Sequence, residues 1–134
     1  MVGVADADAR CPCGSGGSYA ACCEPLHDGR ETAATAERLM RSRYAAYALG
    51  RSAYVFRTWH PRTRPADVEP VPGLVWTGLT VQDVVGGGAD DAEGTVEFEA
   101  AFVTGEGPDV LHERSRFVRR GDRWVYVDGD TNTP

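Results

Sequence analysis

Lysine is absent from this sequence of 134 residues: all fourteen basic residues are arginine, and twenty acidic residues bring the net charge to −6. The sequence pI of about 5.0 argues against binding a nucleic-acid backbone through overall positive charge, although a local arginine patch stays open. A GC-rich genome also favours arginine, alanine and glycine. Arginine abundance alone therefore indicates no partner, and nucleic acid is disfavoured.

Long apolar segments are missing too. No apolar run approaches the roughly 18 to 20 residues that a membrane span requires, and the first ten residues carry neither a basic leader nor a long apolar stretch. We therefore expect a cytoplasmic protein without a membrane partner. The composition, 42% hydrophobic and 25% charged, is that of a globular chain with one domain and room for a small appendage.

The familiar catalytic signatures are also absent. The sequence contains no P-loop, no dinucleotide-binding glycine fingerprint, no zinc-protease HExxH and no Ser-His-Asp motif. Motifs thus give no support to the nucleotide-binding, zinc-protease or hydrolase classes.

The four cysteines, in contrast, are concentrated within thirteen positions as Cys11, Cys13, Cys22 and Cys23. A disulfide fits poorly, because the cytoplasm is reducing and a bridge between adjacent cysteines strains the backbone. Four thiolates complete a tetrahedral shell, for which zinc is the usual occupant and iron the minor alternative. Such a closed shell leaves no position for catalysis, so we expect a structural metal; free or redox-active thiols are the competing interpretation.

The residues around the cysteines suit a metal-binding loop. Residues 14–17, Gly-Ser-Gly-Gly, can turn sharply, and residues 18–21 are long enough for a single helical turn that delivers the second cysteine pair. A segment this short cannot build a hydrophobic core. Metal binding should therefore supply much of its folding free energy.

Two helices are predicted after the cysteines. Thr35 can cap a helix over residues 36–49, where apolar residues recur at helical spacing, and Gly50 is a plausible stop. Ser52 can cap a second, shorter helix that ends before His60, because a residue preceding proline leaves the helical region.

Beyond Gly73 the pattern changes to alternation between apolar and polar residues. Four strands joined by glycine-containing turns are predicted, over residues 74–85, 95–104, 110–119 and 123–128. Gly78 within the first strand suggests a bulge that curves the sheet. Helices followed by successive antiparallel strands give an α+β fold.

Ionisable residues occupy both faces of the third predicted strand, so one set must point into the protein, where it requires partners or a wet cavity. One hypothesis is a pocket for a small anionic ligand, with Arg64 and Arg114 as donors and a tryptophan as the floor. The alternative is a structural network of ion pairs that holds the helices on the sheet. The pocket candidates are Trp59, His60, Arg64, Trp76, His112, Glu113 and Arg114.

An enzyme that uses His60, Arg64, His112 or Glu113 on a small metabolite is the main functional alternative. The catalytic case is weakened because Glu113 points to the opposite strand face from His112 and cannot orient its ring. A weaker alternative is binding of single-stranded nucleic acid or of the ribosome through the arginine and tyrosine residues within residues 41–44. The competing interpretation of these residues is a solvated helix face.

The cysteine motif, Cys-Pro-Cys followed by Gly-Ser-Gly, a tyrosine and Cys-Cys, resembles the SEC-C motif of the SecA translocation ATPase. The resemblance extends through most of the chain to the YchJ family, in the blocks PLH at 25–27, TAERLMRSRYAAY at 35–47, TWHPRTRP at 58–65, LHERSRF at 111–117 and WVYVD at 124–128. The C-terminal tail lacks the second SEC-C motif of some longer relatives, since it contains no cysteine.

This resemblance implies two parts: a SEC-C knuckle over residues 10–30 and a nuclear-transport-factor-2-like domain over residues 31–128. In that domain a helical layer covers a curved four-stranded antiparallel sheet and encloses a cone-shaped pocket. The motif is an interaction module in SecA, so the resemblance also implies a protein partner at the knuckle. We therefore expect a non-enzymatic binding or adaptor protein whose knuckle is structural or docks that partner.

Overall fold

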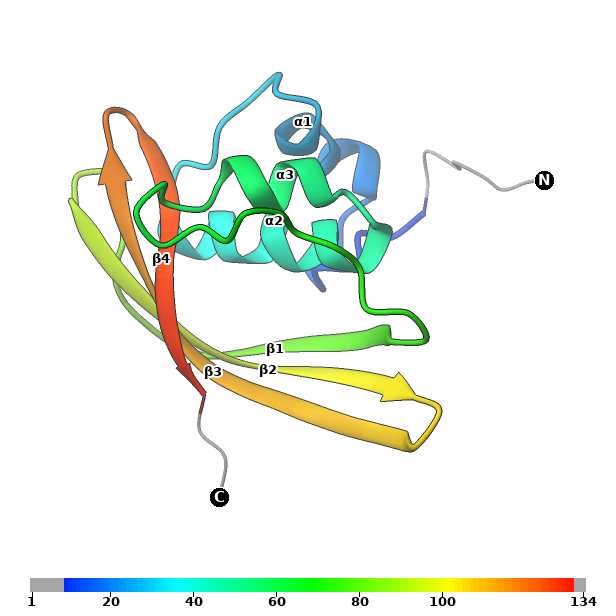
Figure 1. The fold of residues 1–134 in the computed structure, drawn as a ribbon. Helices are drawn as coiled ribbons and strands as arrows, with labels where there is room; N and C mark the ends of the chain where they lie inside the picture. Colours follow the sequence, from blue (N-terminus) through cyan, green and yellow to red (C-terminus); the bar gives the residue numbers. More distant parts are fainter. Residues whose placement is uncertain (1–8, 132–134) are drawn as a thin grey trace.

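The structure is a computed structural model, and it describes residues 9–131 (Figure 1). Short helical segments come first and a continuous run of strands follows. The order is η1 (Tyr19–Ala21), α1 (Glu24–His27), α2 (Ala36–Leu49), α3 (Ser52–Arg57), β1 (Val75–Gly86), β2 (Glu93–Thr104), β3 (Gly107–Arg120) and β4 (Arg123–Thr131). This order confirms the predicted α+β class.

Helix α2 begins and ends where local chemistry predicts. The hydroxyl of Thr35 accepts a hydrogen bond from the Arg38 N–H, and Gly50 closes the helix in the left-handed conformation at φ 74°. Helix α3 differs from expectation, because Ser52 is its first residue and the capping position belongs to Arg51, which makes no side-chain cap. No helix within residues 9–131 is long and apolar enough to cross a bilayer.

The four strands form one antiparallel sheet in the order β1-β2-β3-β4, in which each strand pairs with its neighbours in sequence. The pairing of β1 with β2 shifts register between Trp76 and Gly78, which confirms the bulge expected at this glycine. A second shift follows between Val81 and Asp83. The sheet curves strongly and presents a concave face to the helices, as Figure 1 shows.

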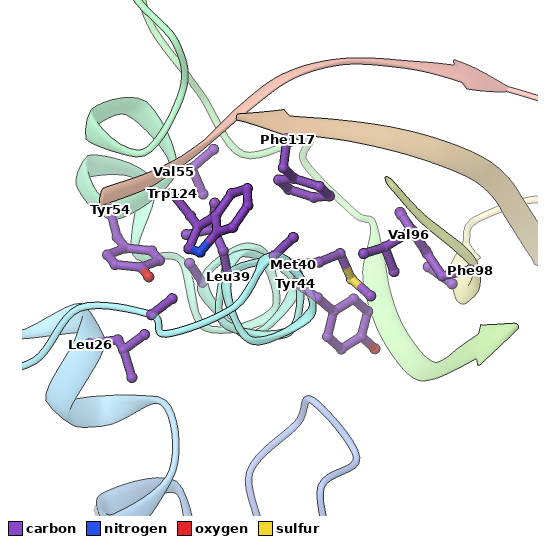
Figure 2. Packing of buried hydrophobic residues seen from close by; sticks show 14 residues of the cluster. Leu26, Leu39, Met40, Tyr44, Tyr54, Val55, Val96, Phe98, Phe117 and Trp124 are labelled. Atoms are coloured by element: carbon purple, nitrogen blue, oxygen red, sulfur yellow. The ribbon is translucent and has the colours of Figure 1, made fainter. Parts of the chain in front are cut away.

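Helix α2 lies against the concave face and contacts β1, β2 and β4, whereas α1 lies on the far side of α2 and α3 from the sheet (Figure 1). Leu39 and Met40 of α2 meet Phe117 of β3 and Trp124 of β4 in the core (Figure 2). Burial of such side chains contributes about 1.5 to 3 kcal/mol each relative to exposure. The Trp124 indole N–H also donates to the Ala34 carbonyl at 3.3 Å.

Candidate functional site

The structure brings the four cysteines together into one cluster. The sulfur atoms of Cys11, Cys13, Cys22 and Cys23 all lie within 4.8 Å of one another. Cys22 Sγ lies 3.6 Å from Cys13 Sγ and 3.9 Å from Cys23 Sγ. A tetrahedral ion with metal–sulfur bonds of about 2.3 Å needs neighbouring sulfurs about 3.8 Å apart. The donor set and its spacing therefore fit one metal ion.

Local turns place these sulfurs. The Cys11 N–H donates to the Gly17 carbonyl at 2.9 Å, which closes the loop, and Gly14 takes φ 82°, a left-handed conformation that suits glycine. Ser18 then caps the short helix Tyr19–Ala21, which carries the chain back to the second cysteine pair. The loop and single helical turn expected from the sequence are both present.

Contacts among the sulfur atoms shift the pKa values of the cysteine thiols in opposite directions. Hydrogen bonds from Cys11 and Cys23 lower the pKa of the Cys13 thiol, and the bond that Cys11 makes to Cys13 raises the pKa of Cys11 to about 12. Metal ligation requires thiolates, so loading this site releases protons. Metal affinity should accordingly fall as the pH falls.

Helix α2 supplies arginines that hold the knuckle backbone. Arg38 Nη2 donates to the Cys22 carbonyl, while its Nη1 lies 3.5 Å from Cys23 Sγ. Arg41 Nη1 donates to the Cys13 carbonyl at 2.8 Å. Positive groups beside a four-thiolate shell also offset part of its negative charge. The knuckle is thus bonded to α2 at both cysteine pairs.

A buried histidine makes a third link between the knuckle and α2. His27 Nε2–H donates to the Ser42 carbonyl at 2.8 Å, and the Tyr19 hydroxyl donates to Nδ1 at 2.7 Å. Both ring nitrogens are therefore occupied by the protein. Burial lowers the pKa of His27, which favours the neutral ring.

A separate cavity of about 310 Å³ lies between α2 and the concave face of the sheet. Its walls are mainly aromatic, with Tyr44, Trp76, Phe98 and Phe117 among them. Cavities of this size are at the small end of ligand pockets.

Arg43 brings a positive charge to this cavity although its side chain is buried. Its Nη1 donates to the Val55 carbonyl at 2.8 Å and to Thr58 Oγ1 at 2.7 Å. The guanidinium also lies 5.1 Å from the Trp59 ring centroid and 4.6 Å from that of Tyr126. Burial lowers the pKa of Arg43, yet arginine stays protonated in proteins.

Glu113 brings a negative charge to the same cavity. Its Oε2 accepts hydrogen bonds from Ser115 at 2.7 Å and from the Tyr126 hydroxyl at 3.0 Å. Burial and the nearby carboxylate raise the pKa of Tyr126, so its hydroxyl keeps its proton. A Cβ at Gly129 would lie 2.2 Å from Oε2, so the carboxylate occupies the space that this glycine leaves.

Only some of the residues predicted to form a pocket line this cavity. Trp59, Trp76 and Glu113 line it. His60 and Arg64 belong instead to the loop after α3, where His60 Nδ1 accepts a backbone N–H at 3.0 Å and Arg64 lies 4.1 Å from a phenylalanine ring centroid.

The other predicted residues, His112 and Arg114, lie on the outer face of the sheet. His112 Nε2 is 2.6 Å from Glu97, and Arg114 pairs with Glu97 at 3.0 Å and Asp83 at 3.1 Å. Arg116 on the same face pairs with two aspartates of β4. These residues form an ion-pair network that joins neighbouring strands on the outer face, whereas the alternative interpretation expected a network that holds the helices on the sheet. The network lies away from the cavity.

Arg43 and Tyr126 are polar cavity residues that the predicted set does not contain. A signal for Arg43 was present, because it lies three residues after Met40 and four before Tyr47 on the apolar stripe of α2. A charge inside such a stripe points into the protein. Tyr126 carries no comparable signal, because its place at the cavity depends on how β4 pairs with β3.

Comparison with known proteins gives two family matches along the chain. Residues 35–129 match the family described as "YchJ, middle NTF2-like domain", and residues 9–25 match the SEC-C motif. A UPF0225 protein of Streptomyces coelicolor is 51% identical over 90% of this chain and 94% of its own length. Another, from Deinococcus radiodurans, is 52% identical over 88% of this chain and 86% of its own.

Solved structures agree with these matches. A SEC-C motif-containing protein from Rhodopseudomonas palustris superimposes with a TM-score of 0.81 at 36% identity, over 92% of this chain and 98% of its own. One from Psychrobacter arcticus reaches 0.77 at 26% identity, over 98% of this chain and 87% of its own. With a family match over most of its length and relatives at half identity, the chain belongs to the YchJ (UPF0225) family.

Proposed function

We propose that this protein is a non-enzymatic, zinc-stabilised binding protein, in which the cysteine knuckle braces the domain and the cavity under α2 binds a small molecule. The cavity carries the proposal. It places two oppositely charged side chains, the buried Arg43 and the partly buried Glu113, among aromatic walls. A charge removed from water without an ionic partner is expensive, and a ligand that pairs with it offsets that expense.

Zinc is the proposed metal because all four ligands are thiolates at tetrahedral spacing. Iron accepts the same ligand set and is the competing occupant. A closed shell of four protein ligands leaves the ion no open position, which supports a structural role.

Bracing is favoured over partner docking by the contacts of the knuckle with α2. Arg38 and Arg41 bind cysteine carbonyls, and His27 bonds to the Ser42 carbonyl. Helix α2 also lines the cavity with Arg43 and Tyr44. A metal that fixes the knuckle therefore fixes one wall of the cavity.

Elemental analysis and native mass spectrometry of the full chain purified from cells test this proposal. We expect one zinc ion per chain and a bound small molecule. Ala100→Leu, which fills the cavity, should lose that molecule, whereas Ala101→Leu on the opposite strand face should keep it. The ligand proposal fails if no molecule copurifies and an apolar probe such as indole leaves the NMR signals of the cavity residues unchanged.

An enzyme that uses Glu113 is the second candidate. Among the four residues considered for catalysis, Glu113 is the one at the cavity, where its carboxylate meets the Tyr126 hydroxyl. Incubation with a metabolite extract distinguishes the two: consumption of a compound by the wild type and not by Glu113→Gln indicates an enzyme. Retention of every compound unchanged supports binding alone.

A further inference from the structure

The two charges of the cavity constrain its ligand more closely. Resting on the proposed small-molecule function, we propose that the cavity binds a zwitterion, a free α-amino acid with an apolar and preferably aromatic side chain. Its carboxylate lies at Arg43 and its ammonium group at Glu113.

Charge balance is the first argument. Arg43 and Glu113 line one cavity, yet no ion pair within 4.0 Å joins them in the described part of the chain. A purely anionic ligand satisfies Arg43 and faces the carboxylate as a like charge, and a purely cationic ligand has the converse problem. A zwitterion pairs with both groups at once.

The positive end has unused donors in a fixed position. Both hydrogen bonds of Arg43 within the described residues come from Nη1, so Nε and Nη2 are left to bind a ligand. Trp59 lines the same cavity, and its Nε1–H is buried without an acceptor among the described residues. A carboxylate accepts several hydrogen bonds and is the group that an arginine edge recognises.

The negative end is fixed in the same way. Both hydroxyl donors, Ser115 and Tyr126, bond to Oε2 of Glu113. Oε1 has no hydrogen bond within residues 9–131 and can accept one from an ammonium group. Because Gly129 has no side chain, the carboxylate keeps this position.

Size and wall chemistry indicate the rest of the ligand. A volume of about 310 Å³ equals about ten water molecules at roughly 30 Å³ each, which suits a ligand of about a dozen non-hydrogen atoms. Tyr44 and Trp76 meet edge to face at 5.9 Å, and Phe117 and Tyr126 meet edge to face at 5.7 Å, so aromatic rings contact one another within the wall. An aromatic side chain matches such a wall.

Calorimetric titration of the full-length, zinc-loaded protein tests the proposal with three probes that share a phenyl ring. These are L-phenylalanine, 3-phenylpropanoate without the ammonium group, and 2-phenylethylamine without the carboxylate. We expect L-phenylalanine to bind at least tenfold more tightly than either analogue. Glu113→Gln should abolish its advantage over 3-phenylpropanoate, and Glu99→Gln on the outer face should preserve it.

The outcomes separate this inference from the function on which it rests. If a singly charged analogue binds as tightly as L-phenylalanine or more tightly, the zwitterion proposal is wrong but small-molecule binding stands. The same conclusion follows if Glu113→Gln leaves the advantage of L-phenylalanine over 3-phenylpropanoate unchanged. Failure of all three probes, together with failure of indole, overturns both. Each analogue removes one charge from the ligand, so the three probes can be compared on the wild-type protein alone. This comparison is valid even if a variant folds poorly.

Discussion

Gly129 shows how one missing side chain positions a charged one. A Cβ at this position would meet three atoms of Glu113, the nearest at 2.2 Å. The carboxylate therefore rests on the backbone of β4 while Ser115 and Tyr126 hold it from the side. Its location at the cavity depends on this glycine.

Gly129→Ala should displace the Glu113 carboxylate and break its hydrogen bonds to Ser115 and Tyr126. Bonds to a charged group contribute about 1.5 to 3 kcal/mol, so we expect the free energy of unfolding to fall by about 2 kcal/mol in urea denaturation. Gly78→Ala is the control, since no atom lies within 4 Å of a Cβ there. Equal stability of the two variants would contradict the contact.

His27 predicts a pH dependence of stability. Burial lowers its pKa, so below about pH 6.5 the unfolded chain binds a proton that the folded chain resists. The free energy of unfolding should therefore fall with acidification, by up to about 1.4 kcal/mol per pH unit. His27→Gln should be less stable near neutral pH and show a shallower decline, measured by urea denaturation with excess zinc.

Excess zinc keeps the cysteines of both proteins ligated as the pH falls, and any remaining effect of cysteine protonation is common to both proteins and cancels in their difference. If the free energy of unfolding depends on pH in the same way for the wild type and His27→Gln, His27 is not the source of the pH dependence.

Residue-scale prediction from the sequence succeeds for the clustering of the cysteines and only in part for the residues that line the cavity. The cysteines are neighbours in sequence, so local turns bring them together. Arg43 and Glu113 reach one cavity only because α2 packs across the concave face of a curved sheet. That curvature depends partly on register shifts, such as the one between Val81 and Asp83, that carry no glycine signal.

At the scale of elements, α2 serves two sites from two sides. Arg38 and Arg41 hold the knuckle, while Arg43 and Tyr44 line the cavity. The helical repeat places Arg43, five residues after Arg38 and two after Arg41, on a different face from both. One helix thereby joins the cysteine cluster to the cavity.

Arg38→Met should weaken metal binding without unfolding the sheet. It removes donors to the Cys22 carbonyl and the Cys23 sulfur. Loss of such supporting bonds typically lowers metal affinity ten- to a hundredfold, which chelator competition measures. Arg62→Met is the matched control, because Arg62 is exposed and its side chain makes no hydrogen bond within residues 9–131. Equal affinities would remove the bracing role of Arg38.

The elements themselves were largely predictable. Helix α2 spans the expected residues because Thr35 and Gly50 are strong local signals. The strands extend further than their alternation indicated: β3 starts at Gly107 and β4 continues to Thr131. Backbone pairing prolongs a strand where apolar and polar side chains no longer alternate. The helix Glu24–His27 was not predicted, because four residues are too few to show a helical repeat of apolar residues.

At the scale of the molecule, the metal should contribute to global stability. Four sulfurs within 4.8 Å repel one another as thiolates when no cation neutralises them, and the backbone carbonyls of two of these cysteines bind arginines of α2. Chelation should therefore lower the Tm by about 10 °C or more, as scanning calorimetry measures. The double variant Cys22→Ser, Cys23→Ser should melt at the lower temperature with or without chelator. An unchanged Tm after complete metal loss would refute bracing.

The uninterrupted order of the sheet has a consequence for how the chain folds. Each strand pairs with its neighbour in sequence, so every hairpin closes a short loop at low entropic expense. Contact between the helices and the last strand is different, since the bond from Trp124 to Ala34 joins residues 90 apart. Chain topology thus assigns the early steps of folding to the hairpins and the slow step to the docking of helix on sheet.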